Sequence, residues 1–260
     1  MQYTKTLSNN LKKNVGKLLT KQGRYKSRQF IAEGFLINLE LLNSESSSPE
    51  FVVISKQCDD ETLSLSKKFA VKGIDVFEAE QNDFEKLCDA QTPQPILSVL
   101  KMKDGIINKN ENFIALDGIA DPGNLGTIIR TADCFGFNNI LLGKNCTDQY
   151  NPKVIRSTMG SFFHCNILFD NDLAEFIPKN YKNFEIYGAT LEAKLEMEKC
   201  IPKDKFGILI GSESHGISKN IRKIIDFEYK IKGGGRAESL NASIAAGISM
   251  YWFGSLIFNY

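Results

Sequence analysis

The sequence predicts an α/β protein of two domains, the second of which is built on a parallel sheet. Short apolar stretches alternate with segments of helical periodicity along the whole chain, which is typical of layered α/β folds. In the second half these stretches are almost continuously apolar, as in parallel strands covered on both faces by helices. Residues 101–112 are polar, follow a Pro-containing turn and indicate a domain boundary near residue 105.

The first domain, residues 1–105, is predicted to be a small α/β layer structure. Apolar residues at helical spacing predict its first helix over residues 9–21. Further helices are expected at 35–42, 62–70 and 83–88, and strands at 29–32, 51–54, 74–77 and 96–100. Residues 1–28 contain eight Lys or Arg and no acidic residue. Such a block suits contact with a nucleic acid, although a solvated helix face has the same composition.

The second domain, residues 106–260, carries the stronger strand pattern. Strands are predicted at 113–116, 139–142, 167–169, 185–189, 207–210 and 229–231. A helix with one apolar face is expected between the first two of them, and the apolar segment 244–258 is expected to be a buried helix. Parallel sheets bind ligands at the carboxyl ends of their strands. Motifs that directly follow a strand are therefore the candidates for chemistry.

Composition excludes several classes of protein. The 32 Lys and Arg nearly balance the 31 Asp and Glu, so the net charge identifies no partner. The six cysteines are scattered without a CxxC pair, and two histidines cannot complete a metal-binding spacing, so no metal is expected. The N-terminus lacks the apolar core of a signal peptide, and no apolar run is long enough to span a bilayer. We therefore expect a cytoplasmic protein without a membrane segment.

The first motif follows the strand at 113–116. A Pro-Gly-Asn turn ending at Asn124 opens a helix, and Arg130 lies two turns inside that helix. Asn124 would serve as an ordinary helix cap and Arg130 as a surface cation in many proteins. A helix N-terminus with an arginine nearby is, however, well suited to hold a phosphate group.

The second motif, residues 211–218, follows the strand at 207–210. It resembles a phosphate-binding loop, but Ile217 stands where the phosphate-binding lysine belongs and Glu213 would repel a triphosphate, which argues against a nucleoside triphosphatase. A glycine-rich dinucleotide fingerprint is also missing. The loop fits an uncharged or cationic ligand better. His215 is interpreted as a surface or loop-packing histidine.

The third motif is reached through three consecutive glycines at 233–235, which allow the backbone to bend sharply against a ligand. Ser239 and Asn241 stand where a helix begins, and both residue types accept hydrogen bonds from free backbone N–H groups there. Small residues over 242–247 allow that helix to pack closely against a neighbour.

Together, the stretches 124–130, 211–216 and 239–243 resemble, in order and spacing, the three motifs of the SpoU/TrmH family. This family comprises RNA ribose 2′-O-methyltransferases of the SPOUT class. The resemblance covers roughly residues 111–260, and residues 151–160 are similar to the family's segment between motifs. The N-terminal part resembles the small ribosomal-protein-like RNA-binding domain of many members.

The resemblance implies a deep trefoil knot in the C-terminal domain, a homodimer, and S-adenosylmethionine bound in the knot. By position, the backbone around Gly211, Ile231 and Leu240 would bind the adenosine of this donor. The family's catalytic positions fall on five residues of the expected type: Asn124, Arg130, Glu213, Ser239 and Asn241. Two roles stay open for the arginine, a clamp on the phosphate beside the reacting ribose or the general base.

The resemblance implies methylation of a ribose 2′-hydroxyl in structured RNA. The extra N-terminal domain favours ribosomal RNA by analogy with the family. The alternatives are a transfer RNA 2′-O-methyltransferase and a non-catalytic RNA-binding relative. A nucleotide-dependent oxidoreductase is disfavoured because the dinucleotide fingerprint is absent.

Overall fold

The computed structural model describes residues 3–257, with only the backbone described at Asp170 and Asn171. It contains two compact units: one comprises the chain up to Lys103 together with Asp148–His164, and the other comprises Asp104–Thr147 together with the chain from Cys165 onward. The division of the chain into two domains at residue 105 stays a prediction. The compact units differ from it because residues 148–164 belong to the first unit.

Buried and half-buried ion pairs hold this returning segment within the first unit. Asp148 Oδ2 lies 2.6 Å from Nη2 of Arg24, and both side chains are buried. Arg156, on helix α7 (Pro152–Ser157), pairs with buried Glu33 and, at 3.0 Å, with Asp89. A sequence pattern does not reveal such long-range pairs, so residues 148–164 are predicted from their position in the chain to lie in the second domain.

The sheet of the first unit is mixed. Its strands are β1 (Thr4–Thr6), β2 (Gln29–Glu33), β3 (Phe51–Ser55), β4 (Asp75–Ala79) and β5 (Ile96–Lys101), in the order β1-β4-β3-β5-β2. The pairs β1–β4 and β3–β4 are parallel, whereas β5 is antiparallel to both β3 and β2. The four longer strands are those predicted. The three residues of β1 are too few to give a recognisable pattern.

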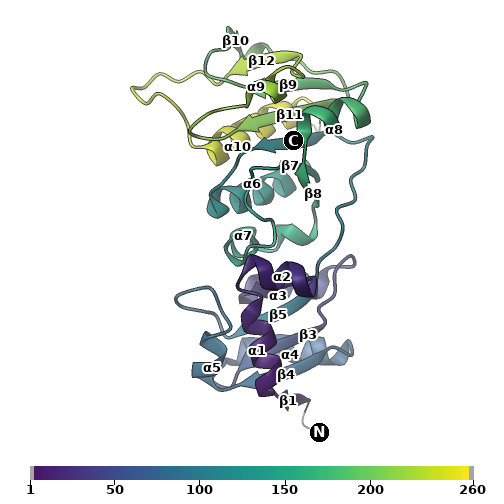
Figure 1. Cartoon of the computed structure of the whole chain (residues 1–260), viewed down its shortest axis with the longest axis vertical. Coiled ribbons are helices and arrows are strands. Elements are labelled where there is room, and N and C mark those ends of the chain that lie inside the picture. The colour runs from purple at the N-terminus through teal and green to yellow at the C-terminus, as the bar shows by residue number, and fades with distance from the viewer. Residues whose placement is uncertain (1–2, 258–260) are drawn as a thin grey trace. The chain divides into compact units, whose positions relative to one another are not determined.

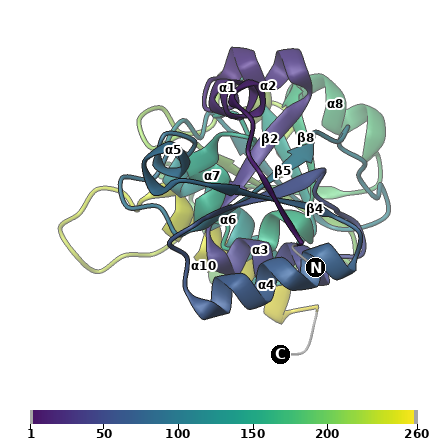
Figure 2. The same cartoon turned by 90° about the horizontal axis from the view of Figure 1, so that it is seen from below.

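Helices cover both faces of this sheet. Helices α3 (Phe35–Asn43) and α4 (Asp60–Val71) pack on one face, and α1 (Asn9–Lys17) and α5 (Gln81–Glu85) pack on the other. Figure 2 shows α1 and α2 (Lys21–Ser27) on the opposite side of the sheet from α3 and α4. The prediction of a single helix over residues 9–21 was wrong. The first helix, α1, ends at Lys17, and Thr20 caps the next helix by accepting a hydrogen bond from the backbone N–H of Gly23.

The sheet of the second unit is entirely parallel, as predicted (Figure 1). Its strands are β6 (Phe113–Asp117), β7 (Asn139–Gly143), β8 (Asn166–Asn171), β9 (Glu185–Ala189), β10 (Leu195–Glu196), β11 (Phe206–Gly211) and β12 (Phe227–Lys230). Their order is β10-β12-β9-β11-β6-β7-β8. The motif-bearing strands β6 and β11 are therefore direct neighbours, and Gly211 pairs with Asp117.

Among the described residues, four α-helices cover this sheet. Helices α8 (Leu173–Asn180) and α9 (Lys219–Arg222) pack on one face. On the other face, Phe253 of α10 (Ala242–Ser255) contacts the rings of Phe206 and Tyr187. Helix α10 also packs on α6 (Pro122–Cys134), where a Cβ at Gly247 would lie 3.5 Å from the Thr131 methyl group.

The final helix was predicted over 244–258; it ends at Ser255, and Phe258 lies outside the described residues. Within residues 3–257, the structure contains no helix with the length and apolar character needed to cross a membrane.

Candidate active site

Three predicted side chains meet at the carboxyl edge of the parallel sheet. Oε1 of Glu213, in the loop after β11, accepts hydrogen bonds from Nδ2 of Asn124 at 2.8 Å and from Nδ2 of Asn241 at 2.6 Å. Nδ2 of Asn241 also lies 3.1 Å from Oδ1 of Asn124. The three motifs, which are separated in sequence, thus form one hydrogen-bonded cluster. We call Asn124, Glu213 and Asn241 the amide–carboxylate cluster.

Helix starts fix two members of the amide–carboxylate cluster. Asn241 caps α10, because its Oδ1 accepts from the backbone N–H groups of Ser243 at 2.9 Å and Ile244 at 3.4 Å. Asp121 caps α6, and its Oδ1 accepts from the backbone N–H of Asn124 at 2.8 Å. The side-chain amide of Asn241 therefore makes hydrogen bonds through both its oxygen and its nitrogen.

The loop that carries Glu213 is closed by its own backbone. Ser212 and Gly216 exchange two backbone hydrogen bonds of 3.1 and 2.9 Å. A Cβ at Gly211 would lie only 2.1 Å from the carbonyl carbon of Gly216, so no larger residue fits without moving backbone. Gly211 was predicted as a donor-binding position. The structure adds a steric reason for a glycine at this position.

A buried carboxylate ties this loop to the first motif. Asp117, at the end of β6, accepts a hydrogen bond of 2.7 Å from the backbone N–H of Ser218. The adjacent Gly118 has a positive φ of 76°, a conformation that favours glycine. Sequence reasoning missed Asp117, although its place at a strand's carboxyl end beside the first motif was the available signal.

Arg130 does not join the cluster. It lies six residues after Asn124 on α6, which corresponds to a rise of about 9 Å along the helix. Its side chain is exposed, and within residues 3–257 it makes no hydrogen bond or ion pair. The guanidinium is therefore available to bind a phosphate or a substrate hydroxyl.

Two of the predicted donor-binding positions, Ile231 and Leu240, flank an exposed glycine loop. Ile231 directly follows β12 and is half-buried, whereas Ser239 and Leu240 are exposed before the first turn of α10. Nothing lies within 4 Å of the Cβ positions of the three glycines at 233–235. The structure does not bring Ser239 into the amide–carboxylate cluster.

The strand order places one further loop, the one after β9, between the loops that carry Gly211 and Ile231. Strand β9 lies between β11 and β12, and Leu209 pairs with Gly188 while Tyr229 pairs with Ala189. Thr190 and the exposed Leu191 therefore emerge between the loop after Gly211 and the loop after Ile231. Sequence reasoning missed this loop, which the carboxyl-end rule for parallel strands indicates.

Two further candidates for chemistry would be the histidine of the second motif and a group of metal-binding side chains. His215 is exposed and its Nδ1 lies 2.7 Å from Oγ of Ser214, in agreement with a surface histidine. Among the described residues, no group of three or more His, Cys, Asp or Glu side chains could hold a metal ion. The expectation that no metal takes part stays a prediction.

Comparison with known proteins identifies the family. Residues 111–251 match the model of the SpoU rRNA Methylase family. The chain belongs to this family. Residues 9–98 match an MRM3-like substrate binding domain. The predicted family and the predicted enzyme class, an RNA methyltransferase, are thereby confirmed.

Individual relatives resemble the chain over nearly its full length. A Bacillus subtilis protein named 23S rRNA (guanosine(2553)-2′-O)-methyltransferase RlmP is 30% identical over 96% of this chain and 98% of its own length. The structure of an AdoMet-bound rRNA methyltransferase from Sinorhizobium meliloti is 26% identical, with a TM-score of 0.83 over 97% of this chain and 96% of that one. The SpoU methyltransferase AviRb from Streptomyces viridochromogenes, at 19% identity, shares the fold with a TM-score of 0.84 over 96% of this chain and 98% of its own. The predicted donor, S-adenosylmethionine, agrees with the bound AdoMet of the second relative.

Proposed function

We propose that this protein transfers a methyl group from S-adenosylmethionine to a ribose 2′-hydroxyl of ribosomal RNA. The observation that carries the proposal is the amide–carboxylate cluster, in which polar residues of three separate motifs interlock at the carboxyl edge of the sheet. A non-catalytic RNA-binding relative would have no need to keep this arrangement. Arg130, exposed on the same helix as Asn124, supplies a cation that has no partner among residues 3–257.

The donor supplies an activated methyl group, and the protein must orient the accepting oxygen and receive its proton. The amide–carboxylate cluster fixes the starts of α6 and α10 relative to the loop after β11, because Glu213 Oε1 also accepts from the backbone N–H of Ala242 at 3.3 Å. We infer that this cluster shapes the space in which the ribose lies. Ser239, exposed beside it, is proposed to contact the ribose or the donor through its hydroxyl.

Arg130 is proposed to act on the nucleotide. A guanidinium presents several N–H donors in one plane, which suits a phosphate next to the reacting 2′-hydroxyl. Arginine releases a proton only with difficulty, which makes it a poor general base. The exposed, unpaired side chain therefore supports the phosphate clamp over the general base, and both roles place Arg130 beside the substrate.

The donor is proposed to bind against the backbone at Gly211, Ile231 and Leu240, with the loop at Thr190 between them. These positions fit the group in three respects. They converge on one sheet edge, the space around the glycines at 233–235 is open, and the Leu191 and Leu240 side chains expose 68% and 45% of their surface for contact with an adenosine. A carboxylate at Glu213 suits the positive charge of a sulfonium.

Three finer features are part of the proposal. Membership of the SpoU rRNA Methylase family supports a trefoil knot. Apolar residues on the outer surface of α10, where Ile244 and Tyr251 are 52% and 57% exposed, support a homodimer. The free state of all six cysteines supports a reducing, cytoplasmic setting.

Ribosomal RNA is proposed over transfer RNA, because the substrate-binding domain accompanies the catalytic fold and the Bacillus subtilis relative carries a 23S rRNA name. The test is methyl incorporation from labelled donor into unmodified 23S rRNA and a pool of unmodified tRNA, at equal nucleotide concentration. Label in the 23S rRNA alone supports the proposal. Label in tRNA alone would replace the substrate class, and label in neither would support a non-catalytic relative.

A further inference from the structure

The basic block at the start of the chain is partly neutralised in the folded protein. Lys5 and Lys12 form ion pairs of 2.6 and 2.5 Å with Asp75 and Asp83, and Arg24 is buried in its pair with Asp148. A charge that is already paired attracts a polyanion less. The block therefore has fewer unpaired cations than its sequence indicates, and another surface with unpaired cations becomes a candidate beside it.

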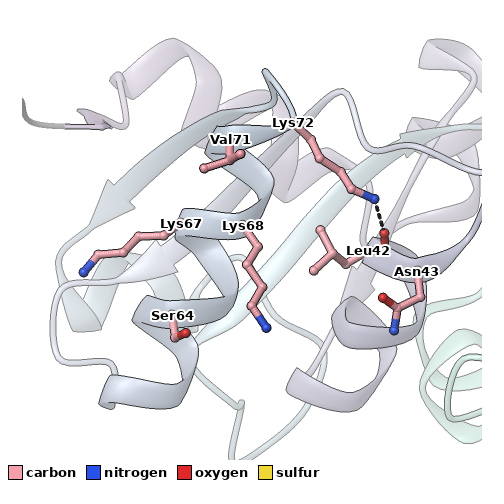
Figure 3. Close-up of a pocket in the computed structure, with 7 residues that line it drawn as sticks. All are labelled: Leu42, Asn43, Ser64, Lys67, Lys68, Val71 and Lys72. Atoms are coloured by element: carbon pink, nitrogen blue, oxygen red, sulfur yellow. Dashed lines mark hydrogen bonds between the residues drawn. The ribbon is translucent and has the colours of Figure 1, made fainter.

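Such a surface lies between the ends of α3 and α4 in the first unit. A cavity of about 470 Å³ opens there, lined by Leu42, Asn43, Ser64, Lys67, Lys68, Val71 and Lys72. Figure 3 shows the side chains of Lys68 and Lys72 reaching from α4 toward the end of α3, with Asn43 on the facing helix. We call this surface the lysine cleft.

The lysine cleft carries positive charge that no acidic residue of its lining neutralises. None of its lining residues is acidic, and within residues 3–257 neither Lys67 nor Lys68 forms an ion pair. Lys68 and Lys72, the residue that caps the C-terminus of α4, lie four residues apart, a spacing at which like charges repel each other. The C-terminal carbonyls of a helix attract nearby cations, which helps to hold them there.

One hydrogen bond holds the side chain of Lys72 in place within the lysine cleft. Nζ of Lys72 donates to the backbone carbonyl oxygen of Leu42 at the end of α3, which leaves its other N–H groups available. Ser64 and Asn43 add neutral hydrogen-bonding groups, and Val71, 89% exposed, adds an apolar rim. Ammonium groups with serine and asparagine are the usual protein contacts of phosphates and sugars in nucleic acids.

We propose that the lysine cleft binds the sugar–phosphate backbone of the RNA substrate. The inference rests on the proposed function, and the cleft lies inside the segment that matches a substrate binding domain, residues 9–98. Point charges without base-reading geometry contribute affinity and orientation but little sequence specificity. The cleft is thus assigned to holding the RNA, and the amide–carboxylate cluster to the chemistry.

The test compares the triple variant Lys67→Ala, Lys68→Ala, Lys72→Ala with the wild type for binding to an unmodified 23S rRNA transcript across salt concentrations. Losing three phosphate contacts should reduce the slope of log K against log salt by about 2–3 and weaken binding about tenfold or more at physiological salt. KM for RNA should rise, while kcat and donor affinity stay unchanged. The double variant Lys67→Ala, Lys68→Ala preserves the Lys72 contact and should give part of the effect.

Two controls carry the same charge change. The triple variant Lys56→Ala, Lys86→Ala, Lys101→Ala removes lysines that already face carboxylates, and it should change the salt slope little. The triple variant Lys13→Ala, Lys17→Ala, Lys26→Ala removes exposed cations of the N-terminal block.

A wild-type slope in the lysine-cleft variants, or an equal loss in the paired-lysine control, overturns the inference. A loss confined to the N-terminal variants overturns it in favour of that block. The proposed function fails separately, if the wild type binds the transcript but methylates no RNA.

Discussion

Nδ2 of Asn241 donates a hydrogen bond of 2.6 Å to Oε1 of Glu213, joining the first residue before α10 to the loop after β11 across 28 residues of sequence. The same carboxylate oxygen accepts from Asn124, which lies 89 residues before it. A single exposed carboxylate thus organises three chain segments. A substitution that removes the carboxylate of Glu213 should disturb the arrangement of the site more than the stability of the fold.

Glu213→Ala is expected to reduce the methylation rate about 100-fold, because the amides of Asn124 and Asn241 lose a charged acceptor worth about 1.5–3 kcal/mol for each hydrogen bond. Glu213→Gln keeps one acceptor oxygen and should lose less. Single-turnover rates at saturating donor and RNA measure the effect, and thermal unfolding should change little since the side chain is exposed. A rate within twofold of wild type for the alanine variant would refute the organising role.

Arg130→Ala is expected to reduce turnover about 100-fold or more, because the exposed side chain can contact the nucleotide. Donor affinity should be nearly unchanged, because the donor is proposed to bind at the other two motifs. Arg130→Lys separates the two roles. A phosphate clamp loses most of its geometry, whereas a base would gain from the lower pKa of lysine. Lys182→Ala, an exposed cation elsewhere in the same unit, is the control. Rapid-quench kinetics that leave the Arg130→Ala rate near normal would exclude a catalytic role.

Gly211→Ala is expected to distort the loop of Glu213, because the new Cβ would lie 2.1 Å from the carbonyl carbon of Gly216. Both the melting temperature and donor affinity should fall. Gly233→Ala is the matched control: nothing lies within 4 Å of its Cβ position, so the free protein should keep its stability. Scanning calorimetry with and without donor separates the effects. Equal stability of the two variants would show that Gly211 is not sterically required.

Arg24→Met is expected to destabilise the first unit by about 3–5 kcal/mol, because it leaves the carboxylate of Asp148 buried without its partner. The exposed pair of Lys5 and Asp75 provides the comparison, and Lys5→Met should cost at most about 1 kcal/mol. Hydrogen–deuterium exchange should show faster exchange over residues 148–164 in the Arg24 variant alone. Unchanged protection of that segment would contradict its anchoring by this pair.

Acid stability should depend on Glu228, whose pKa is lowered from its ordinary value of 4.5, chiefly by hydrogen bonds from Arg222. A lowered folded-state pKa means that the contribution to stability is present above about pH 4.5 and is lost as the pH falls through the folded value. Glu228→Gln should therefore flatten the decline in stability below about pH 4.5. Partial exposure of both side chains limits the effect. Urea midpoints measured from pH 6 to 3, about the range of this titration, check it; parallel curves for the two proteins would exclude the linkage.

Sequence reasoning predicted most of the fold because apolar patterning decides where strands form. The expected strands at 113–116 and 207–210 correspond to β6 and β11, and their ends carry the predicted motifs. The rule that parallel strands present their carboxyl ends at one edge therefore placed the first two motifs together. Patterns that depend on local chemistry were harder to resolve, as at Thr20, where one hydroxyl divides a helix.

Contacts between distant residues could not be predicted in this way. No periodicity links Arg24 to Asp148 or pairs the lysines of the N-terminal block with acids elsewhere. Of the predicted site residues, Asn124, Glu213 and Asn241 make direct contact, whereas Arg130 and Ser239 lie outside the cluster. The catalytic roles of all five residues stay predictions, because hydrogen bonds within the free protein do not reveal contacts with a substrate.

The most direct test of the central claim locates the transferred methyl group on the RNA. Unmodified 23S rRNA is incubated with methyl-labelled S-adenosylmethionine and either wild type or Arg130→Ala, and the RNA is hydrolysed with alkali. Because alkaline cleavage requires a free 2′-hydroxyl, a 2′-O-methyl group leaves its label in an alkali-resistant dinucleotide. We predict labelled dinucleotides with the wild type and almost none with the variant. Label in mononucleotides, or no label at all with the wild type, would contradict ribose methylation at this site.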